Sequence, residues 1–213
     1  KQQQQAKISA YGQLQTSMNA FQDSLAKIND SALYQSLSAN VRGDAIKATA
    51  TADALPGSYR VEVSKLATTG SLASSRVTTS DTDTALDLQG ATAIQLTFGN
   101  SDTVKIDLAA DSSLTDIRDA INANQDSGVN ATIINDGTGY RLALSSKTTG
   151  ADASIASFGF VDAAGATVAG PFAEDAATKQ TGENAALTVN GIAISSANNK
   201  IEGAIQGVTL NLA

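Results

Sequence analysis

Residues 11–28 carry a stripe of large apolar side chains with the spacing of a helix that packs through one face. The apolar positions recur at alternating intervals of three and four residues, the heptad spacing of a seam between helices. They are Tyr11, Leu14, Met18, Phe21, Leu25 and Ile28. Gln, Ser, Asn, Asp and Lys residues occupy most positions between them, so we predict one amphipathic helix from about Gln4 to Ile28, ended by Asn29 and Asp30.

The apolar stripe has two explanations. It packs against its own domain, or its partner helix lies outside this sequence or on another subunit. We favour the second explanation, because no other segment has the pattern of a comparable helix, and an isolated helix is marginal in water. The six residues of the stripe are therefore the candidate functional site, a helix-packing or oligomer seam.

From Val41 onward the apolar period changes to two, which indicates strands. Residues 45–52 alternate, Pro56-Gly57 marks a turn, and Tyr59, Val61 and Val63 alternate again. This pattern predicts a β-hairpin or a pair of sheet-forming strands. The Ser-, Thr- and Asp-rich stretch 67–90 is expected to be loop with one short strand at most.

A compact β-β-α-β-β unit follows in the middle of the chain. Its predicted elements are strands over 94–98 and 104–108, a helix from Leu114 to about Gln125, and strands over 130–134 and 140–144. Ser113 and Asp116 have the spacing of a capping box at the start of that helix. The turn Asn135–Gly139 between the last two strands is a strong hairpin signal.

The last third of the chain is less regular. Residues 150–182 are rich in Ala and Gly and predict one short strand near 155–161. The remaining predictions are a hairpin over 187–194 with Asn190-Gly191 at its tip, a short amphipathic turn over 201–205, and a strand over 208–212. Because the sequence stops on an alternating strand, we expect a truncated chain.

The apolar residues are mostly small and aliphatic. Only five Phe and four Tyr are present, and Trp is absent. Such a composition favours thin sheets packed by β-branched side chains over a deep ligand pocket. The predicted fold class is α+β, mainly β, with an N-terminal helix followed by strand-rich domains.

Charge and hydropathy exclude several classes of partner. The net charge is −7 and no Lys/Arg cluster reverses it locally, so no nucleic-acid partner is predicted. No apolar run reaches the roughly 18 residues of a membrane span, and no signal peptide opens the chain, so no membrane partner is predicted. The absence of Cys is compatible with export that bypasses an oxidising compartment.

The residue types that usually carry catalysis are missing, because the chain contains neither His nor Cys. Asp81, Asp83 and Asp87 loosely have the spacing of a Ca²⁺ loop, but the loop Gly and the final Glu are missing, so a solvated acidic loop is expected. Asp116 and Asp119 lie in the first turns of a predicted helix, where the helix dipole favours negative charge.

Two short motifs were considered as sites and rejected. Ser145-Ser146-Lys147 has the residue types of a Ser-Lys dyad, but neighbours on a strand face opposite ways. Gly137-Thr138-Gly139 lacks the strand-to-helix context of a nucleotide loop. We therefore predict no catalytic residues, no cofactor and no metal, and a protein that is not an enzyme.

Four segments, in order along the chain, share the pattern of one protein family. They are Ile8–Leu14 with the helical stretch through Phe21 and Leu25; Gly57–Ala67, which fits G-x-Y-x-V-x-V-x-x-L-A; Ser112–Leu144; and Leu187–Leu212. Together they resemble the flagellar hook-associated protein 2 family, which caps the flagellar filament. The third segment alone is similar to a repeat shared with hook proteins and flagellins.

The resemblance implies a leg and a head. The leg consists of helices from both chain ends, and the head is β-rich with one domain inserted in another. The expected boundaries are 1–43 for the leg helix, 44–75 with 183–213 for a discontinuous and incomplete first head domain, and 76–182 for the inserted second head domain containing the shared repeat. The first terminal segment and the C-terminal leg are expected to lie outside this chain.

The resemblance also implies a function. Family members sit outside the cell at the filament tip as homo-oligomers, and promote the folding and insertion of exported flagellin. The implied partners are further copies, flagellin, other hook-associated proteins and, before secretion, the export apparatus with its chaperone. The alternatives are a surface adhesin for host mucin or glycans, and a hook–filament junction or flagellin-like subunit.

Overall fold

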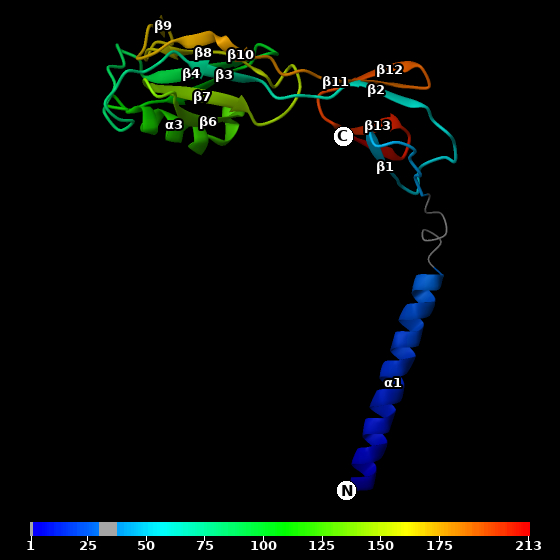
Figure 1. Cartoon of the computed structure of the whole chain (residues 1–213). Coiled ribbons are helices and arrows are strands. Elements are labelled where there is room, and N and C mark those ends of the chain that lie inside the picture. The colour runs from blue at the N-terminus through cyan, green and yellow to red at the C-terminus, as the bar shows by residue number, and fades with distance from the viewer. Residues whose placement is uncertain (1, 30–37) are drawn as a thin grey trace.

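The computed structural model describes residues 2–29 and 38–213 and consists of one long helix followed by strand-rich domains, shown in Figure 1. The predicted class, α+β and mainly β, is confirmed. Helix α1 spans Gln2–Ile28, close to the predicted limits, and the amide of Asn29 donates to the carbonyl of Leu25 at 2.9 Å. Asp30, the other predicted helix end, lies outside the described residues, as does part of the predicted leg segment 1–43.

The first strand-rich domain is built from both ends of the strand region. Its two sheets have the strand orders β1-β14-β13 and β12-β11-β2. The strands are β1 Ile46–Ala50, β2 Val61–Lys65, β11 Ala185–Val189, β12 Ile192–Ser196, β13 Lys200–Ile205 and β14 Val208–Leu212. The cluster of buried residues between these strands is aliphatic, as the composition predicted, and includes Leu187, Ile201 and Leu210.

The predicted pairing of the first two strands as a hairpin is wrong. β1 pairs with β14, with Ile46 opposite Leu212, whereas β2 pairs with β11, with Val63 opposite Leu187. Each strand therefore finds its partner near the far end of the chain. The second reading, a pair of separate sheet-forming strands, is the one that the structure contains.

The predicted turn over 201–205 is also wrong, since this segment belongs to strand β13. Ile201 and Ile205 are four residues apart, a spacing that suits one helical turn and one face of a strand equally well. The pairing with β14 shifts register between Glu202 and Ile205, and Gly203 in this bulge has a φ of +76°. The irregularity hid the alternation that identifies a strand.

The second strand-rich domain contains two four-stranded sheets and a helix. The sheets have the orders β10-β3-β7-β6 and β5-β4-β8-β9. The elements are β3 Ser71–Ser74, β4 Ala93–Phe98, β5 Thr103–Asp107, α3 Leu114–Ala123, η1 Gln125–Ser127, β6 Val129–Asn135, β7 Tyr140–Ser146, β8 Ile155–Val161, β9 Thr167–Val168 and β10 Glu174–Gln180. Strands β9 and β10 were not predicted, since only one short strand was expected within residues 150–182.

The predicted β-β-α-β-β order is confirmed, but its two hairpins lie in different sheets. α3 carries the chain from edge strand β5 of one sheet to edge strand β6 of the other. Its capping box is present, because Ser113 Oγ accepts the Asp116 amide at 3.1 Å and Asp116 Oδ2 accepts the Ser113 amide at 2.9 Å. Ile117 and Ile121 on its inner face are fully buried.

Phenylalanine rings contribute to the mainly aliphatic core of the second domain, whereas the composition favoured packing by β-branched side chains. Four of the five Phe residues are buried there: Phe98, Phe158, Phe160 and Phe172. Phe160 and Phe172 meet edge to face with ring centres 5.1 Å apart, and Phe158 meets Phe172 at 6.1 Å. Phe158, Phe160 and Phe172 therefore form one aromatic cluster in this core.

Packing places the change between the two domains before β3. Ala67 is buried in the first cluster and Leu72 in the second, whereas the predicted boundary followed residue 75. β3 lies in the stretch 67–90, for which one short strand at most was expected, and its sequence Ser-Leu-Ala-Ser has only one large apolar residue. On the return path, β10 ends at Gln180 and Ala185 is buried in the first cluster, on either side of the predicted boundary at 183.

Candidate functional site

The six predicted seam residues all project from α1 into solvent. Their exposed fractions range from 48% for Leu25 to 72% for Tyr11. Among the described residues, the other exposed large apolar side chains are scattered over the two strand-rich domains: Leu55, Tyr59, Leu66, Ile134 and Ile192. The seam is therefore the main concentration of exposed apolar surface in the part of the chain that the structure describes.

The spacing and exposure of the seam suit packing against another helix better than binding of a small ligand. Its side chains form a convex stripe, and the heptad spacing drifts by about 20° per heptad on a straight helix, so that a partner follows it as a left-handed supercoil. Complete burial of one such side chain contributes about 1.5–3 kcal/mol. Burying the exposed half or more of all six would contribute on the order of 5–10 kcal/mol before the cost of association.

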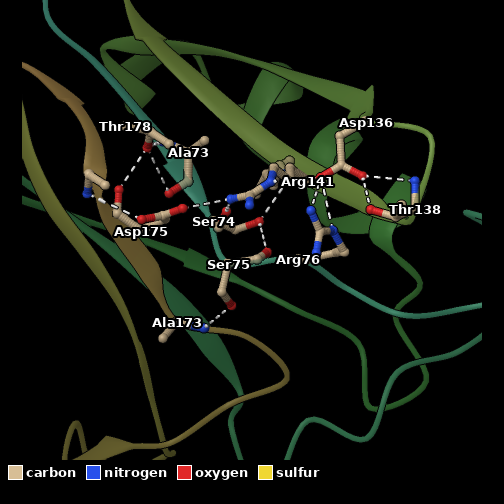
Figure 2. A network of polar contacts seen from close by, with 12 residues as sticks. Ala73, Ser74, Ser75, Arg76, Asp136, Thr138, Arg141, Ala173, Asp175 and Thr178 are labelled. Carbon is tan, nitrogen blue, oxygen red and sulfur yellow. Dashed lines mark hydrogen bonds and ion pairs between the residues drawn. The ribbon is translucent and has the colours of Figure 1, made fainter.

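Asp136 in the second domain belongs to a network of charged side chains with Arg76, Arg141 and Asp175, drawn in Figure 2. Asp136 Oδ2 accepts from Arg76 Nη2 at 2.7 Å, Arg76 Nε at 2.9 Å and Arg141 Nε at 3.3 Å. Asp136 Oδ1 accepts from the amide and hydroxyl of Thr138 at 3.0 and 2.8 Å. Arg76, with Thr138 next in effect, holds the pKa of the Asp136 carboxyl well below its ordinary value.

Arg141 extends this network to two further strands. Its Nη1 atom donates to the carbonyl of Ser74 in β3 at 2.9 Å and to Asp175 Oδ2 in β10 at 2.8 Å. The Arg141 guanidinium lowers the pKa of Asp175. The network therefore ties the β6–β7 turn, the end of β3 and the start of β10 together, and its acids are held in the charged form. A general acid needs the opposite shift.

The acidic loop considered as a cation site satisfies its carboxylates internally. Asp81 Oδ1 accepts from the amides of Asp83 and Thr84 at 3.0 and 2.7 Å, and Asp87 Oδ1 accepts from the Gln89 amide at 3.0 Å. The hydroxyl of Thr84, followed by the amides of Asp83 and Thr84, lowers the pKa of the Asp81 carboxyl. No group of metal-ligating side chains occurs within residues 2–29 and 38–213.

A Ser–Lys contact exists, but not within the triplet 145–147 that was considered. Lys147 Nζ donates to Ser127 Oγ at 3.0 Å, and Ser127 in turn donates to the carbonyl of Val129 at 3.0 Å. Ser127 is fully buried, so its hydroxyl is closed to a substrate. The pair is 20 residues apart in sequence, which is why no local motif indicated it.

Neither described helix has the combination of length and apolar character that crossing a membrane requires.

Comparison with known families separates the same parts of the chain as the packing does. The description "Flagellar hook-associated protein 2 N-terminus" matches residues 1–70, and "Flagellar hook-associated protein 2 C-terminus" matches residues 182–213. Between them, "Flagellin hook IN motif" matches residues 93–148, which contain the β-β-α-β-β unit. A crystal structure of the flagellar cap protein FliD D2-D3 domains from Serratia marcescens is 36% identical, with 79% of this chain and 93% of that chain covered at a TM-score of 0.60.

The chain belongs to the flagellar hook-associated protein 2 family.

Other members of the flagellar hook-associated protein 2 family match nearly the whole chain. The protein of that name from Escherichia coli K12 is 37% identical over 205 residues, with 92% of this chain covered. The alignment spans 43% of the length of that relative. A crystal structure of the flagellar cap protein FliD D1-D2-D3 domains from E. coli is 33% identical, with 96% of this chain and 59% of that chain covered at a TM-score of 0.75.

Proposed function

We propose that this chain is part of a structural cap at the distal end of the bacterial flagellar filament, outside the cell. Support comes from the two matches to the N- and C-terminal parts of the hook-associated protein 2 family, which flank a motif shared with flagellin and hook proteins. The relatives solved as structures carry the name flagellar cap protein. The role is one of assembly, without bond chemistry.

The observation that carries the mechanism is the exposed seam of α1. Six large apolar side chains on one face of this 27-residue helix are 48–72% exposed. Such a stripe is unfavourable in water, and packing against another helix would bury it. We propose that Tyr11, Leu14, Met18, Phe21, Leu25 and Ile28 form the leg contact of the cap. The partner is a helix from elsewhere in the full-length protein or from a neighbouring copy.

The two strand-rich domains form the head in this proposal. Several copies assemble into the cap, and the cap holds newly exported flagellin while the subunit folds and inserts beneath it. Other hook-associated proteins are neighbours during assembly, and the export apparatus with a chaperone handles the chain before secretion.

The seam is tested by placing a charge in its middle. Phe21→Asp in the full-length protein, expressed in a strain that lacks its own cap gene, is expected to abolish swimming and leave unpolymerised flagellin in the medium. Thr16→Asp is the matched control, because Thr16 is exposed on the opposite face of α1 and receives the same charge. Normal filaments with Phe21→Asp, at normal levels of exported protein, would count against the seam as the leg contact.

A further inference from the structure

The two strand-rich domains are joined by two passages of chain that lie against each other. Residues 66–70 lead from the first domain into the second, and residues 181–184 lead back. The amide of Thr68 donates to the carbonyl of Glu183 at 2.9 Å. In return, the amide of Glu183 donates to the carbonyl of Thr68 at 3.3 Å. Lys65 and Glu183 also form an ion pair. Two paired passages permit less rotation than one, but they do not by themselves fix an angle between domains.

The loop that follows β7 in the second domain forms hydrogen bonds with both passages. Gly150 donates its amide to the carbonyl of Thr68 at 3.0 Å, and Ala151 donates its amide to Asn184 Oδ1 at 2.8 Å. Ser154, which is 1% exposed, accepts the amide of Gly182 at 2.8 Å. This loop therefore holds both passages at once.

The first domain grips the outgoing passage from the other side. Asn199, at the start of the β13 hairpin, accepts the Ala67 amide at 2.7 Å and donates to the Ala67 carbonyl at 3.0 Å. This side chain takes the place of a neighbouring strand beside Ala67. The start of the outgoing passage is thus fixed to the first domain by a two-way amide contact.

The two gripping loops also touch each other directly. Thr149 of the second domain donates its hydroxyl to the carbonyl of Ala197 in the first domain at 2.6 Å. Gly150 is buried with a φ of +104°, and a Cβ there would lie 2.8 Å from the Cβ of Ala197. Only glycine suits both the backbone conformation and the space at this position.

We infer that these contacts form a lock that holds the two head domains as one rigid unit, with the angle between them set where Thr149 and Gly150 meet Ala197. The lock does not depend on the cap role. It follows that a substitution at Gly150 changes the angle or the mobility between the domains while leaving both domain cores intact. Without the lock, residues 66–70 and 181–184 would act as a hinge.

The lock is tested by measuring a distance between the domains with spin labels. The chain has no native Cys, so labels can be placed at Lys47→Cys in β1 and Lys105→Cys in β5, both exposed strand positions in different domains. A single narrow distance distribution by electron double resonance is expected. Gly150→Ala is expected to shift or broaden this distribution.

The matched control is Gly165→Ala, whose φ of +82° carries similar backbone strain but whose Cβ would meet nothing within 4 Å. A label pair within the second domain, Lys105→Cys with Thr132→Cys, reports whether each variant is folded. If Gly150→Ala fails to fold by that measure, Thr149→Val decides in its place. A broad interdomain distribution in the parent, or a junction variant indistinguishable from Gly165→Ala, overturns the lock.

Discussion

Replacing Phe160 by Ala would remove the ring that lies deepest in the second domain. Phe160 is 1% exposed, packs edge to face on Phe172 at 5.1 Å, and closes against Gly170, whose Cβ position would lie 2.2 Å from its ring. These neighbours belong to separate strands and turns and cannot all move in to fill the space. The cost should therefore lie within the usual range for Phe→Ala in a core, about 3–5 kcal/mol. A domain of this size has a total stability of about 5–15 kcal/mol.

The effect should be confined to the second domain, because the two clusters of buried residues are separate. Calorimetry should show one unfolding transition lowered by roughly 15 °C or more. Hydrogen exchange should accelerate in β4 and β8 more than in β11 and β14. Leu187→Ala, which is 2% exposed in the first cluster, is the matched control and should give the reverse pattern. A loss below about 1 kcal/mol for Phe160→Ala, or equal acceleration in both domains, would refute the division into two cores.

Two further predictions concern polar contacts of the second domain. Ser113→Ala should destabilise that domain by about 1 kcal/mol in urea unfolding, because the capping box loses its hydroxyl acceptor. Ser113→Thr keeps a hydroxyl and should retain most of the stability. Equal stability of the two variants would contradict the role of the cap. The folded-state pKa values of Asp136 and Asp175 are lowered, by Arg76 and Arg141 respectively, so their contribution is complete above about pH 4 and is lost as the pH falls further towards the folded values. Asp136→Asn should therefore flatten the loss of stability between about pH 4 and pH 2, and an unchanged pH profile would show that the network contributes nothing.

The elements that the sequence predicted correctly are those whose signals are local. The heptad stripe of α1, the capping box at Ser113 and the Asn190-Gly191 turn each depend on residues within a few positions of one another. Asn190 and Gly191 have φ values of +50° and +83° and join β11 to β12, as the Asn-Gly signal predicted. Such features are decided before the chain makes any long-range contact.

Most errors arose where long-range pairing decides the outcome, whereas the missed strand β13 is a local case, caused by the bulge at Gly203. β1 and β2 follow each other closely in sequence, yet each pairs with a strand more than 100 residues away, which no local pattern specifies. β3 and β10 form part of the second domain although their sequences are rich in Ser, Ala and charged residues. They pair with each other, and β3 also pairs with β7; Arg141 and Thr178 add side-chain contacts to this pairing.

The candidate site could be chosen from the sequence because its apolar stripe lacks a comparable helix to pack against. A heptad stripe without a comparable second helix in the sequence predicts a seam whose partner lies elsewhere, and the six residues lie exposed on α1. The Arg76–Asp136–Arg141 network and the lock at Thr149 and Gly150 had no comparable signal. Each depends on a contact between residues far apart in sequence: Arg76 with Asp136 in the network, and Thr149 with Ala197 in the lock.

The position of the protein on intact flagella tests the central claim most directly. Gold-labelled antibodies against the second domain, applied to flagella with hooks attached, would reveal its location by electron microscopy. A cap role predicts label at the distal end of the filament and loss of that label in a strain without the gene. Label at the junction between hook and filament, or along the length of the filament, would contradict the account.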